Sequence, residues 1–115
     1  MSKRTDKEFL PDIQEAIRRI NLYNSTLTYE DFLYRIETQD AVLRNLEIIG
    51  EAAKNISSDL KRKHRNIPWK DIAGMRDKII HFYFGVNLDI VWATVKEKLP
   101  EFKNEIEKIL RGLGL

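Results

Sequence analysis

Apolar residues recur along most of the chain at intervals of three and four positions, the spacing that places side chains on one face of an α-helix. The clearest case lies within residues 36–57, where five apolar residues follow this spacing: Val42, Leu46, Ile49, Ala53 and Ile56. The spacing predicts further long helices over residues 6–24, 68–84 and 88–109, and short helices from residue 29 and within residues 57–66. No stretch argues for a strand, so we expect an all-α fold: an up-and-down four-helix bundle with one or two short extra helices.

Several residues mark where these helices begin and end. Thr28 and Asp31 form a variant of the capping box, in which side chains at a helix start bond to free backbone N–H groups. Pro68 suits the first position of a helix, because its missing N–H is not needed there. Gly85 is expected to end that helix. Pro100 interrupts the last apolar stripe, so the final helix should kink or split near it.

The helix over residues 36–57 carries a second apolar surface. Ala41, Ile48 and Ala52 lie about 100° round the helix from the main stripe. A helix with two apolar faces usually contacts two partners, here the core of the same chain and a second subunit.

Composition narrows the class of protein without deciding its function. The chain has 115 residues, which predicts a single domain over residues 1–115. A net charge of +2 permits nucleic-acid binding but does not require it. The absence of cysteine excludes disulfides, thiolate metal sites and cysteine nucleophiles. A polar N-terminal segment, and no apolar run long enough to span a bilayer, favour a cytoplasmic protein.

The segment RDKIIHFYFG, residues 76–85, combines polar groups that can act on a phosphodiester. A histidine such as His81 can accept and donate a proton near neutral pH. The guanidinium of Arg76 stays charged and presents a planar set of donors to phosphate oxygens. Because RNA supplies its own nucleophile, the 2′-hydroxyl, this pair needs neither a metal ion nor a cofactor. The products would be a 2′,3′-cyclic phosphate and a 5′-hydroxyl.

Helix geometry sets a condition on this chemistry. Arg76 and His81 are five positions apart, so an ideal helix separates them by about 140°. A site that contains both requires either a distorted helix end or contributions from two chains of a two-fold dimer. In the non-catalytic alternative, Arg76, His81 and Tyr83 are a capping group, a cation favoured by the helix dipole and a half-buried aromatic.

A basic run follows the long helix. Its four cations are candidates for contact with RNA or with an acidic partner protein: Lys61, Arg62, Lys63 and Arg65. The alternative for so short a run is a solvated loop. His64 lies within it and is interpreted as a surface residue rather than a second catalytic histidine. No motif with the spacing of metal ligands is present, so no metal site is expected.

Four polar residues lie along the other side of the long helix: Arg44, Glu47, Glu51 and Asn55. Helical spacing allows Arg44 to pair with Glu51, and Glu51 with Asn55. One of the four can instead orient Arg76 or His81, and the sequence does not distinguish them. Asp77 is interpreted as a solvated charge, with pairing to a neighbouring cation such as His81 as the alternative.

Longer segments point to a family. RDKIIHFY matches the R-x4-H-x-Y signature of the HEPN superfamily. The surroundings resemble the HepT-like branch in four segments: TYEDFL, TQDAVLRNLEIIGEAAKNIS, IPWKDIAGMRDKIIHFYFGVNLDIVW and LPEFKNEIEKIL. The resemblance extends over nearly the whole chain, from about residue 12 to residue 110, and the combination of these segments is far more specific than the short signature.

The resemblance implies a helical bundle that dimerises, with the motif at the dimer cleft. Proteins of this kind resemble metal-independent ribonuclease toxins of type II/VII-like toxin–antitoxin systems, each paired with a minimal nucleotidyltransferase antitoxin. On this basis Arg76 and His81 are the catalytic pair, and Tyr83 is the position that the antitoxin modifies with AMP. Phe82 is bulkier than the residue common there in the family. That difference favours an alternative, a non-enzymatic helical partner or substrate subunit of the nucleotidyltransferase.

Overall fold

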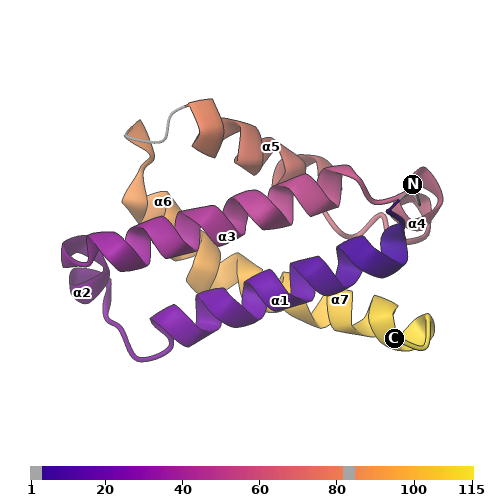
Figure 1. Ribbon diagram of the computed structural model, residues 1–115, viewed down its shortest axis with the longest axis horizontal. Helices are drawn as coiled ribbons and strands as arrows, with labels where there is room; N and C mark the ends of the chain where they lie inside the picture. The colour runs from indigo at the N-terminus through magenta and orange to yellow at the C-terminus, as the bar shows by residue number, and fades with distance from the viewer. Residues whose placement is uncertain (1–3, 82–84) are drawn as a thin grey trace.

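The structure is a computed structural model that describes residues 4–81 and 85–115 (Figure 1). Its elements are α1 (Asp6–Asn24), α2 (Tyr29–Tyr34), α3 (Ile36–Lys54), α4 (Ser58–Lys63), α5 (Trp69–His81), α6 (Leu88–Ala93), the π-helical turn η2 (Thr94–Lys98) and α7 (Leu99–Gly112). No strand occurs among the described residues, and the predicted all-α class is confirmed. None of the described helices has both the length and the hydrophobicity that a membrane span requires.

The long helices run up and down against one another. Figure 1 shows α1 and α3 side by side in opposite directions, with α5 along the outer side of α3. α7 packs against α1. Within α5, Trp69 and Ile79 are the buried residues, so much of this helix remains uncovered.

The apolar stripe predicted for the long helix lies at the centre of the core, and all five of its residues are buried. Of the second apolar surface, Ala52 is buried, whereas Ala41 and Ile48 remain partly exposed. The chain itself therefore covers part of this surface. Ile48 packs against the core and also borders a groove that contains Arg76.

The capping box predicted at Thr28 is present at the start of α2. The backbone N–H of Asp31 donates to Thr28 Oγ1 at 3.1 Å, and the N–H of Thr28 donates to Asp31 Oδ2 at 3.2 Å. The short helix places the buried ring of Phe32 5.3 Å from the ring of Trp92. Trp92 also lies 5.7 Å from the ring of Tyr29, so it joins α2 to α6.

The interruption predicted near Pro100 lies just before the proline. α6 ends at Ala93, and the π-helical turn η2 follows before α7 begins. Pro100 occupies the first turn of α7, where its missing N–H leaves no helical bond unmade. The extra residue per turn in η2 separates the two α-helical segments. Pro100 therefore predicted where the α-helix is interrupted. It did not predict that the interruption is a π-helical turn.

The predicted start of the helix that carries the motif agrees with that of α5 to within one residue. Pro68 lies one position earlier than predicted: it directly precedes Trp69, and its carbonyl accepts a hydrogen bond from the Ile72 N–H at 3.1 Å. The predicted end at Gly85 follows residues 82–84, which lie outside the described part of the chain, so it stays a prediction.

Candidate functional site

Arg76 lies on the side of α5 that meets α3. Its Nε is 2.6 Å from Glu51 Oε2 on α3, and its Nη1 donates to Asp77 Oδ1 at 3.2 Å. The side chain is 29% exposed, so it is partly enclosed but still reaches solvent. Two carboxylates thus orient the guanidinium, and several of its five N–H donors remain available for an anion.

A glycine of α3 makes this placement possible. A Cβ at Gly50 would overlap the Cβ of Arg76 and would lie 3.1 Å from the backbone oxygen of Ile72. α5 therefore approaches α3 here more closely than a side chain would allow. The close approach brings the guanidinium within reach of Glu51, the residue that follows Gly50.

Arg76 borders a shallow groove of about 340 Å³ between α1, α3 and α5. Two other arginines border the same groove. Arg4 forms an ion pair with Asp12, and Arg44 lies 3.3 Å from Glu47. The groove thus holds three guanidinium groups, which match phosphate oxygens well, and each is paired with a carboxylate that lines the same groove. Among the described residues, no group of three or more histidine, aspartate or glutamate side chains comes together that could hold a metal ion.

His81 is the last residue of α5 and is exposed. The helix is regular through both Arg76 and His81, so the two side chains leave it in different directions, as predicted. His81 is not among the residues that line the Arg76 groove. Of the two arrangements that could bring these residues together, a distorted helix is not found within α5. Asp77 pairs with Arg76, and no ion pair joins it to His81 in the described part of the chain.

The modification position predicted at Tyr83 falls within residues 82–84, outside the described residues. Its role, and the effect of Phe82 beside it, therefore stay predictions.

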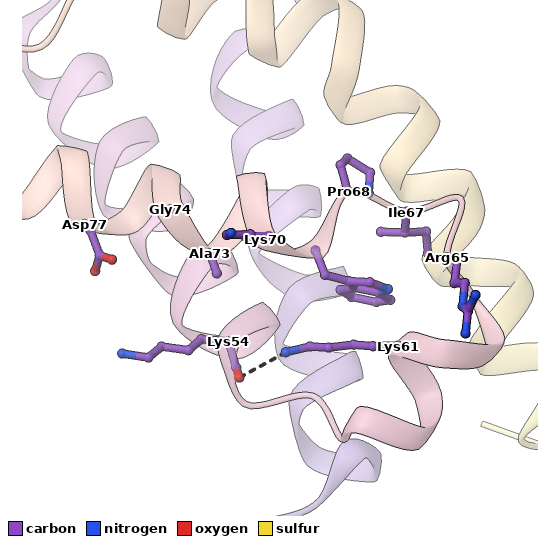
Figure 2. Close-up of a pocket in the computed structure, with 10 residues that line it drawn as sticks. Lys54, Lys61, Arg65, Ile67, Pro68, Lys70, Ala73, Gly74 and Asp77 are labelled. Atoms are coloured by element: carbon purple, nitrogen blue, oxygen red, sulfur yellow. Dashed lines mark hydrogen bonds between the residues drawn. The ribbon is translucent and has the colours of Figure 1, made fainter.

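The fold divides the basic run. Lys61 and Arg65 line a second groove, which is bounded by α4, α5 and the end of α3 (Figure 2). Arg62 instead forms an ion pair with Asp59, one turn earlier in α4. Neither Arg62 nor Lys63 is among the residues that line this groove. Two of the four predicted contact residues thus share a concave surface, and the other two do not.

Of the polar residues on α3, Glu51 is the one that contacts Arg76. The predicted pair between Arg44 and Glu51 is wrong, because Arg44 meets Glu47 instead. The predicted contact between Glu51 and Asn55 is present, with Asn55 Nδ2 3.3 Å from Glu51 Oε1. Sequence spacing reports only neighbours on one helix. The contact between Glu51 and Arg76 depends on how two helices pack, so no local signal singled out Glu51.

The sequence model of one protein family, described as Ribonuclease HepT-like, matches residues 13–109. The chain belongs to this family. The matched segment runs from α1 into α7 and contains Glu51, Arg76 and His81. The resemblance drawn from RDKIIHFY and its surroundings is thereby confirmed.

Named relatives share most of the length of the chain. The Probable ribonuclease HepT of Thermococcus cleftensis is 52% identical, over 93% of this chain and 97% of its own. The Putative RNase MJ1216 of Methanocaldococcus jannaschii is 46% identical, over 98% of this chain and 93% of its own. A protein named Gamma-glutamylcyclotransferase and putative RNase MJ0434, from the same organism, is 45% identical over 48% of its own length. No solved structure matches the chain.

Proposed function

We propose that this HepT-like protein is a metal-independent endoribonuclease toxin. It acts as a homodimer and is controlled by a minimal nucleotidyltransferase antitoxin, in a type II/VII-like pair. The observation that carries the proposal is Arg76 held by Glu51 at an open groove, on the same helix as an exposed His81. Membership of a ribonuclease family supports RNA as the substrate.

Arg76 binds the scissile phosphate. When the 2′-oxygen of the ribose bonds to phosphorus, negative charge grows on the non-bridging oxygens, and the guanidinium stabilises that charge. The contact with Glu51 at 2.6 Å sets the direction of the guanidinium before RNA arrives. Such preorganisation lowers the barrier, because no side chain has to be ordered during the reaction.

His81 transfers the proton. It accepts the proton of the 2′-hydroxyl, or donates one to the departing 5′-oxygen as the bond between phosphorus and that oxygen breaks. One RNA fragment then ends in a 2′,3′-cyclic phosphate and the other begins with a 5′-hydroxyl. The exposed position of His81 at the end of α5 leaves the imidazole accessible to a strand.

A two-fold dimer supplies these two groups to one phosphate. Arg76 and His81 leave α5 about 140° apart, so one chain does not direct both at the same point. α5 is an outer helix with much of its surface uncovered, which leaves room for a second copy. A copy packed beside it brings the His81 of one chain to the Arg76 groove of the other.

Modification of Tyr83 turns the ribonuclease activity off. In AMPylation its hydroxyl oxygen attacks the α-phosphate of ATP, pyrophosphate leaves and the tyrosine carries an adenylyl group. The group adds negative charge and bulk two positions from His81. RNA is then repelled from the cleft and excluded by size.

The test is cleavage of RNA by the purified protein in the presence of EDTA. Wild type is expected to release fragments with 2′,3′-cyclic phosphate ends, and His81→Ala and Arg76→Ala to be slower by about 100-fold or more. Identical background cleavage by all three proteins would refute the enzymatic proposal. It would leave the alternative, a non-enzymatic helical partner of the nucleotidyltransferase.

A second measurement tests regulation by the nucleotidyltransferase. Incubation with the nucleotidyltransferase and ATP should raise the intact mass of the wild type by whole AMP units, and Tyr83→Phe should remain unmodified. Growth after induction separates the two functions, since a ribonuclease toxin arrests cells and a non-enzymatic partner does not. His81→Ala is the matched control for arrest, because it retains Tyr83.

A further inference from the structure

The groove that contains Lys61 and Arg65 is the larger of the two grooves, at about 690 Å³, and the proposed reaction does not use it. Pro68 provides exposed apolar surface within it, and the buried side chains of Ile67 and Trp69 lie beneath. Trp69 is held in place, because its Nε1 donates to the backbone oxygen of His64 at 3.1 Å and its ring packs edge-on against Phe102. The groove is thus a preformed concave surface of the size that ligand sites in proteins commonly have.

Positive charge dominates the rim. Figure 2 shows Lys54 and Lys61 on one side of the groove, opposite Lys70, with Arg65 at one end and Asp77 at the other. Asp77 is the one carboxylate among the lining residues. None of the four cations forms an ion pair with another described residue. The ammonium of Lys61 donates to the backbone oxygen of Lys54 at 3.3 Å (Figure 2), a neutral acceptor, so no carboxylate of the described residues neutralises any of the four charges.

The α5 side of the groove leads to His81. Lys70, Gly74 and Asp77 line the groove, and His81 continues their spacing of four and three positions along one stripe of the helix. Lys70 and His81 are about 16 Å apart along the helix axis, at 1.5 Å per residue. An extended strand that follows this stripe from Lys70 would pass Asp77 and then reach the imidazole.

We infer that this groove binds the phosphate backbone of single-stranded RNA on one side of the scissile bond and guides the strand to His81. The inference rests on the proposed function and extends it, since it adds a binding surface separate from Arg76. Lysine and arginine side chains outside ion pairs suit a chain of phosphates, and the exposed ring of Pro68 can contact a sugar or base without reading its identity. An acidic protein segment would match the charge, but the continuity with His81 favours the nucleic acid.

Gly74 allows a negative charge to be introduced into the groove without disturbing the fold. A Cβ at Gly74 would meet no atom within 4 Å. Gly112, in the last turn of α7 and away from the groove, is equally open. Gly74→Glu and Gly112→Glu therefore add the same charge at two uncrowded helical positions, one inside the groove and one outside it.

The experiment measures RNA binding by a full chain that does not cut. In a His81→Ala background, the affinity for a labelled single-stranded RNA of mixed sequence is followed by fluorescence anisotropy at several salt concentrations. Gly74→Glu should weaken binding by about tenfold and Gly112→Glu by less than about twofold. Helix content measured by circular dichroism confirms that each variant is folded.

Charge removal provides an independent comparison. Lys61→Ala/Arg65→Ala should weaken binding by about tenfold and reduce the slope of log affinity against log salt by about 0.7 for each phosphate that the variant no longer neutralises. Lys98→Ala/Arg111→Ala removes the same charge from exposed positions outside the groove and should have a much smaller effect.

Each outcome is decisive. If the groove variants and their controls weaken binding equally, the effect is one of overall charge and the groove inference fails, while cleavage by wild type still supports the proposed function. If neither the His81→Ala parent nor any of its variants binds RNA, and wild type does not cleave RNA, the groove inference and the proposed function both fail. If the groove variants keep RNA binding but no longer bind the nucleotidyltransferase, the groove belongs to that protein partner and the assignment to RNA is overturned.

Discussion

The direction of the Arg76 guanidinium depends on a carboxylate from another helix. Glu51 Oε2 lies 2.6 Å from Nε, whereas Asp77 is the next residue in the chain and meets Nη1 at 3.2 Å. Glu51 is half exposed, so this pair contributes little to the free energy of unfolding. Its main effect is to restrict the rotamers of Arg76, and under the proposed function this restriction matters for activity rather than for stability.

We therefore predict that Glu51→Ala lowers kcat for RNA cleavage by about 10- to 100-fold with a smaller change in KM. A freely rotating guanidinium still attracts RNA, but it no longer meets the transition state in a fixed orientation. Glu51→Gln should retain more activity, because its amide oxygen can still accept from Nε. Steady-state kinetics at constant ionic strength, with unfolding measured in parallel, distinguish orientation from a loss of stability.

Glu15 on α1 provides the control for Glu51. Its carboxylate accepts two hydrogen bonds from Arg18, at 2.7 and 2.8 Å, and these bonds together with Arg19 lower the pKa of Glu15 to about 2. Glu15→Ala breaks an arginine–carboxylate pair outside the groove with the same change in net charge. Equal losses of kcat in the Glu15 and Glu51 variants would contradict a specific role for Glu51.

The contact between α3 and α5 is the element-level feature that positions the site. The helices themselves could be predicted, because the apolar residues of α3 repeat with the period of a helix and bury one face. The distance between α3 and α5 could not be predicted, because a glycine in a sequence does not reveal which neighbouring segment will approach it. At Gly50 that neighbour is the backbone of α5, and at Gly74 nothing lies within 4 Å.

We predict opposite effects for the same substitution at these two glycines. Gly50→Ala should lower the free energy of unfolding by about 1–2 kcal/mol, because the new Cβ overlaps that of Arg76 and forces the helices apart. Gly74→Ala should raise it by about 0.5–1 kcal/mol, because alanine favours the helix and meets no obstacle. Urea unfolding followed by circular dichroism measures both. Stabilisation by Gly50→Ala would show that α5 does not pack on α3 at this distance.

At the scale of the whole molecule, the proposed reaction requires one phosphate to meet two side chains that leave α5 in different directions. Arg76 lies on the side of α5 that faces α3. His81 lies at the end of α5, on the same stripe as the α5 residues that line the groove of Lys61 and Arg65. A site shared between two chains resolves this separation, and it makes a prediction that a site within one chain does not.

Mixing Arg76→Ala with His81→Ala should restore ribonuclease activity that neither variant has alone. In a mixed dimer, one of the two shared sites receives an intact Arg76 and an intact His81 from different chains. After full subunit exchange, statistical pairing gives about a quarter of the wild-type activity. RNA cleavage measured against the mixing ratio tests this, with each variant mixed with itself as the control. Absence of recovery, with mixed dimers demonstrated by mass spectrometry, would place both groups of a working site in one chain.

The sequence by itself determined the helices, the break near Pro100, the family and the angular separation of Arg76 and His81. These follow from periodicities within single segments, which do not depend on how the segments pack. Only the tertiary structure decided that Glu51 is the partner of Arg76, and that Lys61 and Arg65 share a groove that Arg62 and Lys63 do not line. Such relations join residues on different helices. Their distances are set by the close approach at Gly50 and by the path of the chain between α4 and α5, which no local pattern encodes.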